Sequence, residues 1–415
     1  MSNTKIPKVL SLFSGAGGLD IGFEQAGFET VGCLESDFYA RETLKLNRPG
    51  WPLLSPSDVT LWESGRISKA LGLAVGELDL LLAGPPCQPF SKASYWSNGK
   101  AKSMADPRAA TLMKTLDFVE ELLPRAVVIE NVPAFAYRKQ NEGLRLIRSS
   151  LRKINKKHGT NYSSTLTVIN AVHYGVPQRR ERAFIVVYRD GKRFRSPVTT
   201  NSASASSKKA PLISAFDAFD GLEVGDAERR DLALGGKWAD LLPSIPEGRN
   251  YLYHTPEGEG VPLFGWRTRY WSFLLKLSRE LPSWTLPASP GPATGPFHWE
   301  NRHLSVREMC RLQTFPDSWN IVGSYREARK QIGNAVPSAM AEAVARRVWS
   351  DLLRLPYDSS LSLALNPTSA CIPAYELASV PDKYLDLVGP HRRHPGSGKG
   401  PAASKWAKEH SVAHG

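Results

Sequence analysis

The chain has 415 residues, which leaves room for one large domain and a smaller second one. Hydrophobic residues make up 41% of it and charged residues 22%, values that are typical of globular proteins and exclude a chain that is disordered or fibrous throughout. The net charge of +13 indicates an anionic partner, with nucleic acid as the leading candidate. A basic, solvated surface without a partner would give the same charge.

The cysteines indicate neither a disulfide framework nor a zinc site, because Cys33, Cys87, Cys310 and Cys371 are far apart and form no CxxC pair. No apolar run approaches the length of a membrane span, and the N-terminus lacks the apolar segment of a signal peptide. We therefore expect a cytoplasmic protein with no bound metal and no membrane partner.

The N-terminal stretch predicts a ligand-binding loop. Residues 8–12 read as a strand, and the glycine-rich residues 13–18 lead into a helix that reaches about Ala26 and ends at Gly27. The glycines would let a ligand approach the backbone closely. The dinucleotide pattern GxGxxG is absent, because Asp20 stands where its third glycine would fall.

Two carboxylates strengthen that prediction. A second strand, residues 30–34, ends at Glu35, which is placed to bind ribose hydroxyls. Asp58, which we expect at the end of a third strand, could reach an adenine amino group. Either acid alone would more often be a plain surface residue. Together with the glycine-rich loop they predict a ligand that carries a nucleoside.

The most informative stretch surrounds Cys87. The apolar run 78–83 predicts a buried parallel strand, and the Gly-Pro-Pro sequence at 84–86 ends it in a stiff turn. Cys87 is thus expected at the carboxyl end of a central strand, where open α/β sheets bind their ligands. Most cysteines are small buried hydrophobes, but this turn predicts a nucleophile instead. The polar residues 91–106 read as a loop that closes over a substrate.

Glu130 is the candidate proton donor. A helix at 108–123 precedes a strand at 126–129, which would deliver Glu130 to the same edge of the sheet as Cys87. A carboxyl group in such a place can donate a proton if its pKa is raised. A glutamate that caps a turn is the alternative.

Three arginines within four positions lie between apolar stretches at 168–174 and 183–188, both expected as strands. They could hold phosphates or a base carbonyl oxygen; they are Arg179, Arg180 and Arg182. The basic helix predicted at 138–158 reads instead as a solvated surface.

The composition changes at about residue 190. Residues 199–209 are rich in Ser and Ala and read as a linker or flexible insertion. Periodicity is then poor and aromatic residues are frequent up to about residue 300. The sequence GWRTRYW at 265–271 mixes basic and aromatic side chains as nucleic-acid contacts do. Residues 190–300 hold thirteen basic and thirteen acidic side chains, so DNA binding would require the basic ones to share one face.

Regular structure returns after residue 300. Ser305 and Glu308 predict a capping box for a helix that ends before Phe315. The sequence QIGNAVP at 331–337 leads into a last helix that reaches about Leu353. The chain after Pro390 has little apolar content and is expected to be disordered.

With these pieces in place, the chain resembles the C5-cytosine DNA methyltransferases of bacterial restriction–modification systems. The resemblance covers about residues 8–188 and 302–350, and the motifs occur in the family's order. They are FSGAGG at 13–18, Glu35, GPPCQPFS at 84–91, ENV at 130–132, QRRER at 178–182, the segment 302–319 and QIGNAVP at 331–337.

The resemblance implies a fold and a division of the chain. The fold is α/β, a doubly wound Rossmann-like sheet of the class I methyltransferase type, with a smaller and irregular target-recognition domain. We expect four parts: a catalytic and cofactor-binding domain at 1–189, a target-recognition domain at 190–319, a segment at 320–355 that packs back on the catalytic domain, and a partly disordered extension at 356–415.

The resemblance also implies roles for particular residues. Cys87 would be the nucleophile, Glu130 the acid at cytosine N3, Arg182 a contact to the base, and Arg180 a neighbour of a phosphate or of the catalytic loop. The residues implied to contact DNA are Ser91, Gln178, Arg180, Arg267 and Arg269.

The implied cofactor is S-adenosylmethionine. Glu35 would bind its ribose and Asp58 its adenine, while Asn334 and Val336 would close the pocket from the C-terminal side. The remaining implied contacts come from the backbone of Phe13, Ser14, Gly15, Ala16 and Gly17, and from Pro85.

The implied partner is double-stranded DNA, bound by a monomer that works beside a restriction endonuclease. Three alternatives stay open on the sequence. An RNA cytosine methyltransferase on the same scaffold would act on transfer RNA. A nicotinamide-dependent oxidoreductase would need the glycine that position 20 lacks. A non-catalytic DNA-binding protein would not need the full set of catalytic residues that the resemblance implies, Cys87, Glu130 and Arg182.

Overall fold

The computed structural model describes residues 6–86, 109–136, 142–204, 207–265 and 271–389. Several residues singled out by the sequence lie outside these ranges: Cys87, Ser91, Arg267 and Arg269, together with the expected closing loop and the tail from Pro390.

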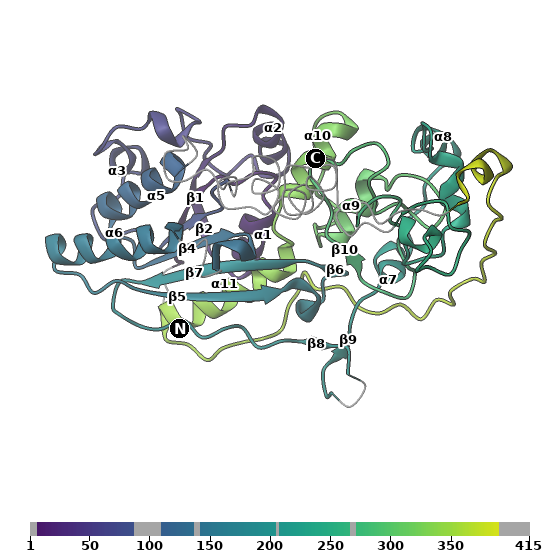
Figure 1. The fold of residues 1–415 in the computed structure, drawn as a ribbon. Coiled ribbons are helices and arrows are strands. Elements are labelled where there is room, and N and C mark those ends of the chain that lie inside the picture. The colour runs from purple at the N-terminus through teal and green to yellow at the C-terminus, as the bar shows by residue number, and fades with distance from the viewer. Residues whose placement is uncertain (1–5, 87–108, 137–141, 205–206, 266–270, 390–415) are drawn as a thin grey trace, which may run out of the picture.

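A six-stranded sheet forms the centre of the N-terminal half, in the order β2-β1-β3-β4-β7-β5 (Figure 1). The four strands on one side of it pair in parallel, whereas β7 is antiparallel to both β4 and β5. The strands are β1 (Lys8–Leu12), β2 (Glu29–Leu34), β3 (Leu80–Ala83), β4 (Ala126–Asn131), β5 (Ser163–Asn170) and β7 (Glu181–Tyr188). This order, with β1 in the interior and crossovers in both directions, confirms the doubly wound prediction.

Helices cover both faces of the sheet, because successive strand residues point to opposite sides. Leu80 and Leu82 pack with α1 (Gly18–Gln25) and α11 (Ser338–Leu353) on one face. Leu81 and Ala83 pack on the other face. The helices there are α3 (Arg66–Leu71), α5 (Ala109–Leu122) and α6 (Glu142–His158), while α2 (Phe38–Asn47) follows β2.

The segment expected as a strand at 168–174 is in part a helix. Strand β5 starts earlier than expected and ends at Asn170, whose side chain accepts a hydrogen bond from the Val172 N–H and so begins the short helix η4 (Ala171–Tyr174). Gly175 then has φ 70°, in the left-handed region, which turns the chain into β6 (Gln178–Arg179). The prediction was wrong here because an apolar run does not reveal a cap in its middle.

Residues 190–300 contain short elements. They are β8 (Asn201–Ser202), β9 (Ala210–Pro211), α7 (Ala215–Phe219), α8 (Asp226–Asp231), η5 (Ala239–Ser244), η6 (Tyr251–His254) and β10 (Ser283–Trp284). Those from η5 onward include residues that pack around a separate hydrophobic core, whereas α7 packs against α9 (Val306–Leu312). Trp238 illustrates the separate core, since its ring lies 5.2 Å from that of Phe264 and 5.8 Å from that of Phe273. We refer to residues 190–300, the larger part of the target-recognition domain expected at 190–319, as the recognition region. Most of this region, from α7 onward, lies beside the sheet, on the right in Figure 1.

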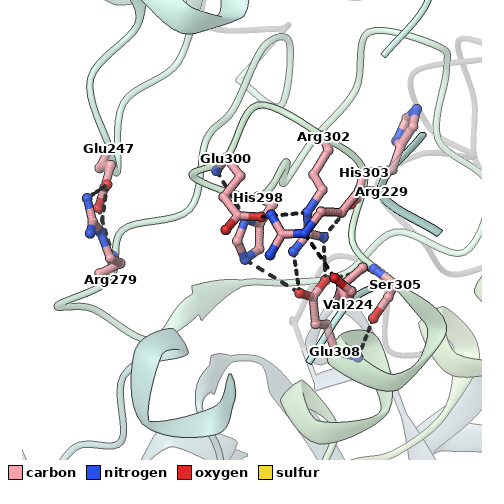
Figure 2. A network of polar contacts seen from close by, with 10 residues as sticks. All are labelled: Val224, Arg229, Glu247, Arg279, His298, Glu300, Arg302, His303, Ser305 and Glu308. Carbon is pink, nitrogen blue, oxygen red and sulfur yellow. Dashed lines mark hydrogen bonds and ion pairs between the residues drawn. The ribbon is translucent and has the colours of Figure 1, made fainter. Parts of the chain in front are cut away.

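The segment after residue 300 joins the two halves. Helix α9 (Val306–Leu312) begins with the expected capping box of Ser305 and Glu308, which the structure confirms. Glu308 also accepts two hydrogen bonds from Arg302, at 2.9 and 2.7 Å, inside the polar network that Figure 2 shows. Farther along, the Trp319 indole N–H donates to the Ala16 carbonyl oxygen at 3.1 Å.

The last helices return to the sheet. After α10 (Tyr325–Asn334), α11 lies against α1 so closely that a Cβ on Gly22 would come within 2.5 Å of Ala341. Residues 356–389 then run in extended form along the edge of the molecule to η8 (Asp382–Leu387), which contacts the recognition region (Figure 1). The part of the expected extension that the structure describes is therefore fixed to the rest of the protein at several points.

Candidate active site

The carboxyl ends of three neighbouring strands meet at Gly84, directly after β3. A Cβ placed on Gly84 would lie 3.7 Å from Glu130 Oε2 at the end of β4, and 3.8 Å from the Phe13 carbonyl oxygen at the end of β1. The Asn131 side-chain amide donates to the Pro85 carbonyl oxygen at 3.3 Å. The glycine-rich loop, the Pro-Pro turn and the predicted acid are thus brought to one place.

Glu130 is paired with Arg182, whose Nε lies 2.7 Å from Glu130 Oε1. Both side chains are largely buried. Burial raises the pKa of Glu130, and the nearby guanidinium groups of Arg182 and Arg180 oppose the rise. The site therefore contains a carboxyl group that holds its proton to a higher pH than an exposed glutamate does.

The glycines of the loop 13–18 serve different purposes. A Cβ on Gly17 would lie 2.9 Å from the Trp319 ring, and one on Gly18 would lie 2.4 Å from the Val336 carbonyl oxygen. Both glycines are needed for packing on that side, and their expected backbone contact with a ligand stays a prediction. Only Gly15, with φ 55°, has nothing within 4 Å of the Cβ position. Phe13 also has a positive φ, 60°, which marks a sharp turn after β1.

Two acidic side chains lie behind this loop. Glu35 accepts hydrogen bonds from the N–H groups of Gly15 and Asp37, both at 2.7 Å, and burial raises its pKa. Asp20, in the first turn of α1, is 2% exposed, and no cation pairs with it among the described residues; the hydroxyl groups of Ser11 and Ser14 lie near it. Burial raises the pKa of Asp20 to about 6. The loop is therefore backed by negative charge, which suits a cationic ligand.

Comparison with known proteins identifies the family. Residues 7–350 match the C-5 cytosine-specific DNA methylases. The chain belongs to this family.

Its relatives include named enzymes of restriction–modification systems. The chain is 37% identical to the Type II methyltransferase M.SacI of Streptomyces achromogenes over 378 residues, which cover 84% of this chain and 94% of the relative. It is 31% identical to the Type II methyltransferase M.NgoFVII of Neisseria gonorrhoeae, over 84% and 87% of the two chains. The protein is therefore a DNA (cytosine-5-)-methyltransferase of the bacterial restriction–modification type.

A solved structure supports the fold. The crystal structure of a DNA modification methyltransferase encoded within an E. coli prophage superposes with a TM-score of 0.59 at 23% identity, over 84% of this chain and 99% of that one. The class I methyltransferase fold expected from the sequence is confirmed.

Two residues expected to contact DNA in this methylase are buried instead. Arg180 is 1% exposed and donates to the carbonyl oxygens of Gly333 and Ala335, at 2.7 and 2.9 Å. Gln178 is 0% exposed and donates to the Leu312 carbonyl oxygen at 3.2 Å. Both side chains bind the backbone of the segment after residue 300. The place of Arg180 near a phosphate or the catalytic loop, and the DNA contact of Gln178, stay predictions.

The remaining cofactor candidates of the methylase lie in three different settings. Asp58 does not end a strand; it caps the short helix η1 (Val59–Leu61), where its side chain accepts a hydrogen bond from the Thr60 N–H at 2.8 Å. Val336 is buried against Gly18. Asn334 is the exposed last residue of α10.

Sequence reasoning missed Asp20 and Trp319. Asp20 was noticed only as the residue that breaks a dinucleotide pattern, although an acid directly after a glycine-rich turn falls in the first turn of the following helix, against the loop. Trp319 lies 303 residues from its partner Ala16, so no local pattern could reveal the contact. The described residues contain no group of three or more metal-binding side chains, and no helix among them is long and apolar enough to span a membrane.

Proposed function

We propose that this methylase transfers a methyl group from S-adenosylmethionine to carbon 5 of cytosine, within a specific sequence of double-stranded DNA, with Cys87 as the nucleophile. The observation that carries the proposal is the buried Glu130–Arg182 pair, which lies against Gly84 three residues before Cys87. Methylation of carbon 5 needs a proton donor and a thiol close together. Glu130 would be the donor, and the expected turn after Gly84 carries the thiol of Cys87.

The reaction begins with activation of the cytosine ring. The Cys87 thiolate forms a bond to carbon 6 while Glu130 donates its proton to N3, which makes carbon 5 nucleophilic. S-adenosylmethionine, when bound, supplies an electrophilic methyl group on a sulfonium. After carbon 5 has gained the methyl group it loses its proton to a base, and the bond between sulfur and carbon 6 breaks to release the thiolate. The N3 proton then returns to the Glu130 carboxylate, which restores both the neutral base and the acid. Arg182 holds the Glu130 carboxyl group toward the ring and can bind the base.

The residues present fit this cofactor. Asp20 and Glu35 provide negative charge behind the open face of Gly15, and the Val336 carbonyl oxygen lies against the start of α1. A sulfonium and an ammonium group would be attracted there, whereas the pyrophosphate of a dinucleotide would be repelled. This counts against a nicotinamide-dependent enzyme. Glu35 would bind the ribose, since each of its oxygens can accept a further hydrogen bond.

A cytosine inside a duplex cannot reach this buried edge of the sheet. We therefore propose that the base is flipped out of the stack, at a cost of a few kcal/mol, into the space in front of Glu130. We further propose that the enzyme acts as a monomer and protects the host's DNA against a companion endonuclease.

The test compares the wild-type protein with Cys87→Ser. Incubation with methyl-labelled S-adenosylmethionine and unmethylated genomic DNA from an organism without this enzyme should label the DNA only with the wild type, and bisulfite sequencing should then reveal one methylated sequence. A duplex carrying 5-fluorocytosine in that sequence should form a covalent adduct with the wild type alone. If transfer RNA is labelled while DNA is not, or if Cys87→Ser methylates DNA normally, the proposal is wrong.

A further inference from the structure

Arg179 differs from the two arginines that follow it. Arg180 is buried on backbone carbonyl oxygens, and Arg182 is paired with Glu130. Arg179 is exposed, and among the described residues its guanidinium has no carboxylate partner. Of the three arginines that the sequence offered for an anion, only this one has its charge available.

Arg179 lies over Trp284, which is in turn packed against Trp271. Its Cζ lies 5.1 Å from the centre of the Trp284 ring, and that ring lies 5.5 Å from the Trp271 ring, edge to face. A guanidinium stacked on an aromatic face keeps its N–H donors free at its edge. We call Arg179, Trp271 and Trp284 the Arg179 platform.

The backbone fixes the platform between the two halves of the enzyme. Strand β6, which carries Arg179, pairs in parallel with β10, which carries Trp284. The Thr285 hydroxyl donates to the Arg179 carbonyl oxygen at 2.7 Å. Trp271 belongs to the recognition region and is 44% exposed. Trp271 and Arg179 are both exposed, so a partner molecule can contact them.

The platform is close to the active site. Arg179 precedes Arg182 by three residues, so their Cα atoms lie within about 11 Å of each other. Successive phosphates of one DNA strand are about 3.4 Å apart along the helix axis. A duplex whose target cytosine reaches Glu130 therefore passes within about three nucleotides of Arg179.

We propose that Arg179, whose guanidinium lies over the Trp284 ring, binds a backbone phosphate of the DNA next to the target cytosine. The inference rests on the proposed function, because it places the duplex over the Glu130–Arg182 pair. Phosphates are the commonest partners of arginine in DNA complexes, and the contact would fix the position of the duplex without reading its sequence. It assigns a phosphate to the one arginine of the three for which the resemblance implied no role.

The test measures how DNA affinity depends on salt. Fluorescence anisotropy gives Kd for DNA at several salt concentrations. Two labelled duplexes of about two helical turns are compared: one has a mixed sequence, and the other contains the target sequence found by bisulfite sequencing. Each neutralised phosphate contributes about 0.9 to the slope of log Kd against log salt for duplex DNA. Arg179→Ala should reduce the slope by about 1 and weaken binding several-fold on both duplexes. Arg179→Lys should restore the slope, because the charge is kept.

Arg152→Ala is the matched control, since Arg152 is an exposed arginine on the outer face of α6. Its slope should equal that of the wild type, and thermal melting should show that all the variants fold. The inference is overturned if Arg179→Ala keeps the wild-type slope, or if Arg152→Ala loses as much. Because binding is read without methyl transfer, a wild type that methylates no DNA would refute the proposed function alone.

Discussion

The Glu130 carboxyl group lies between opposing influences. Burial disfavours its charged form, whereas the guanidinium of Arg182, 2.7 Å away, and that of Arg180 favour it. Burial is the larger influence, so the pKa is raised and the group is better suited to donate a proton than an exposed glutamate at the same pH.

Glu130→Gln should lower kcat by about 10²- to 10⁴-fold, because an amide cannot give up a proton to N3. An acid acts only while it is protonated, so wild-type kcat should fall as the pH rises through the raised pKa of Glu130. The variant should lack this fall, because glutamine does not titrate. The measurement is the pH dependence of single-turnover methylation. Glu181→Gln removes an exposed carboxylate nearby and should behave like the wild type. Equal kcat values for Glu130→Gln and the wild type would exclude the assigned role.

The arginines at 179, 180 and 182 show how far the role of a single residue can be predicted from the sequence. Their shared charge predicted an anion or a base nearby, but their tasks depend on which way each side chain points. Arg180 points at the carbonyl oxygens of Gly333 and Ala335, more than 150 residues away in the chain, and such contacts leave no local signal.

At the scale of elements, strands and helices with a clear period were predictable. The first strand was expected at 8–12 and is observed at Lys8–Leu12, and the helix expected at 108–123 is observed at Ala109–Leu122. The strand is buried on both faces and the helix on one face. Burial of this kind requires apolar residues at regular positions, and the sequence shows them. The recognition region has no such pattern. Its aromatic rings pack between short irregular turns, so composition showed that it was different but not how it folds.

Helix α1 contains a second titrating group that affects stability. The pKa of Asp20 is raised to about 6 in the folded protein, above its ordinary value of 3.8. The folded state therefore binds the proton more tightly than the unfolded state, and stability decreases as the pH rises from about 4 through about 6. Without cofactor, Asp20→Asn should increase the free energy of unfolding at pH 8 by up to about 3 kcal/mol and flatten this pH dependence.

The same substitution should weaken binding of S-adenosylmethionine, because it removes negative charge from behind the loop. Chemical unfolding at pH 4.5 and 8 measures the first effect, and calorimetric titration with the cofactor measures the second. Asp226→Asn is the control, since Asp226 is an exposed acid in the first turn of α8. A variant whose stability at pH 8 is no higher than that of the wild type would show that the buried carboxylate is compensated in another way.

At the scale of the whole molecule, residues 356–389 connect the two halves a second time. The segment leaves α11, where Glu342 accepts hydrogen bonds from the N–H groups of Ser362 and Leu363, at 3.0 and 2.9 Å. It then reaches the recognition region, where the Thr368 N–H donates to Asp217 and Arg279 donates to the Pro373 carbonyl oxygen. The segment ends at η8, where Tyr384 is buried. A strap fixed at both ends limits how far the recognition region can move from the sheet.

Tyr384 is the anchor at the far end of this strap. It is 3% exposed, its ring stacks on Trp238 at 5.8 Å, and its hydroxyl donates to the Lys237 carbonyl oxygen at 2.7 Å. Truncating a buried aromatic residue costs about 3–5 kcal/mol. Because the lost contacts belong to the recognition region, Tyr384→Ala should loosen that region and leave the sheet intact.

Limited proteolysis and cofactor titration separate these effects. In Tyr384→Ala, cleavage within residues 190–300 should be faster and KM for DNA should rise, while the affinity for S-adenosylmethionine stays at the wild-type value. Leu377→Ala, an exposed position on the same strap, should change none of these. Tyr384→Phe should lie between the two, because it keeps the ring and loses only the hydroxyl. If Tyr384→Ala weakens cofactor binding as much as DNA binding, the strap supports the whole fold rather than the placement of the recognition region.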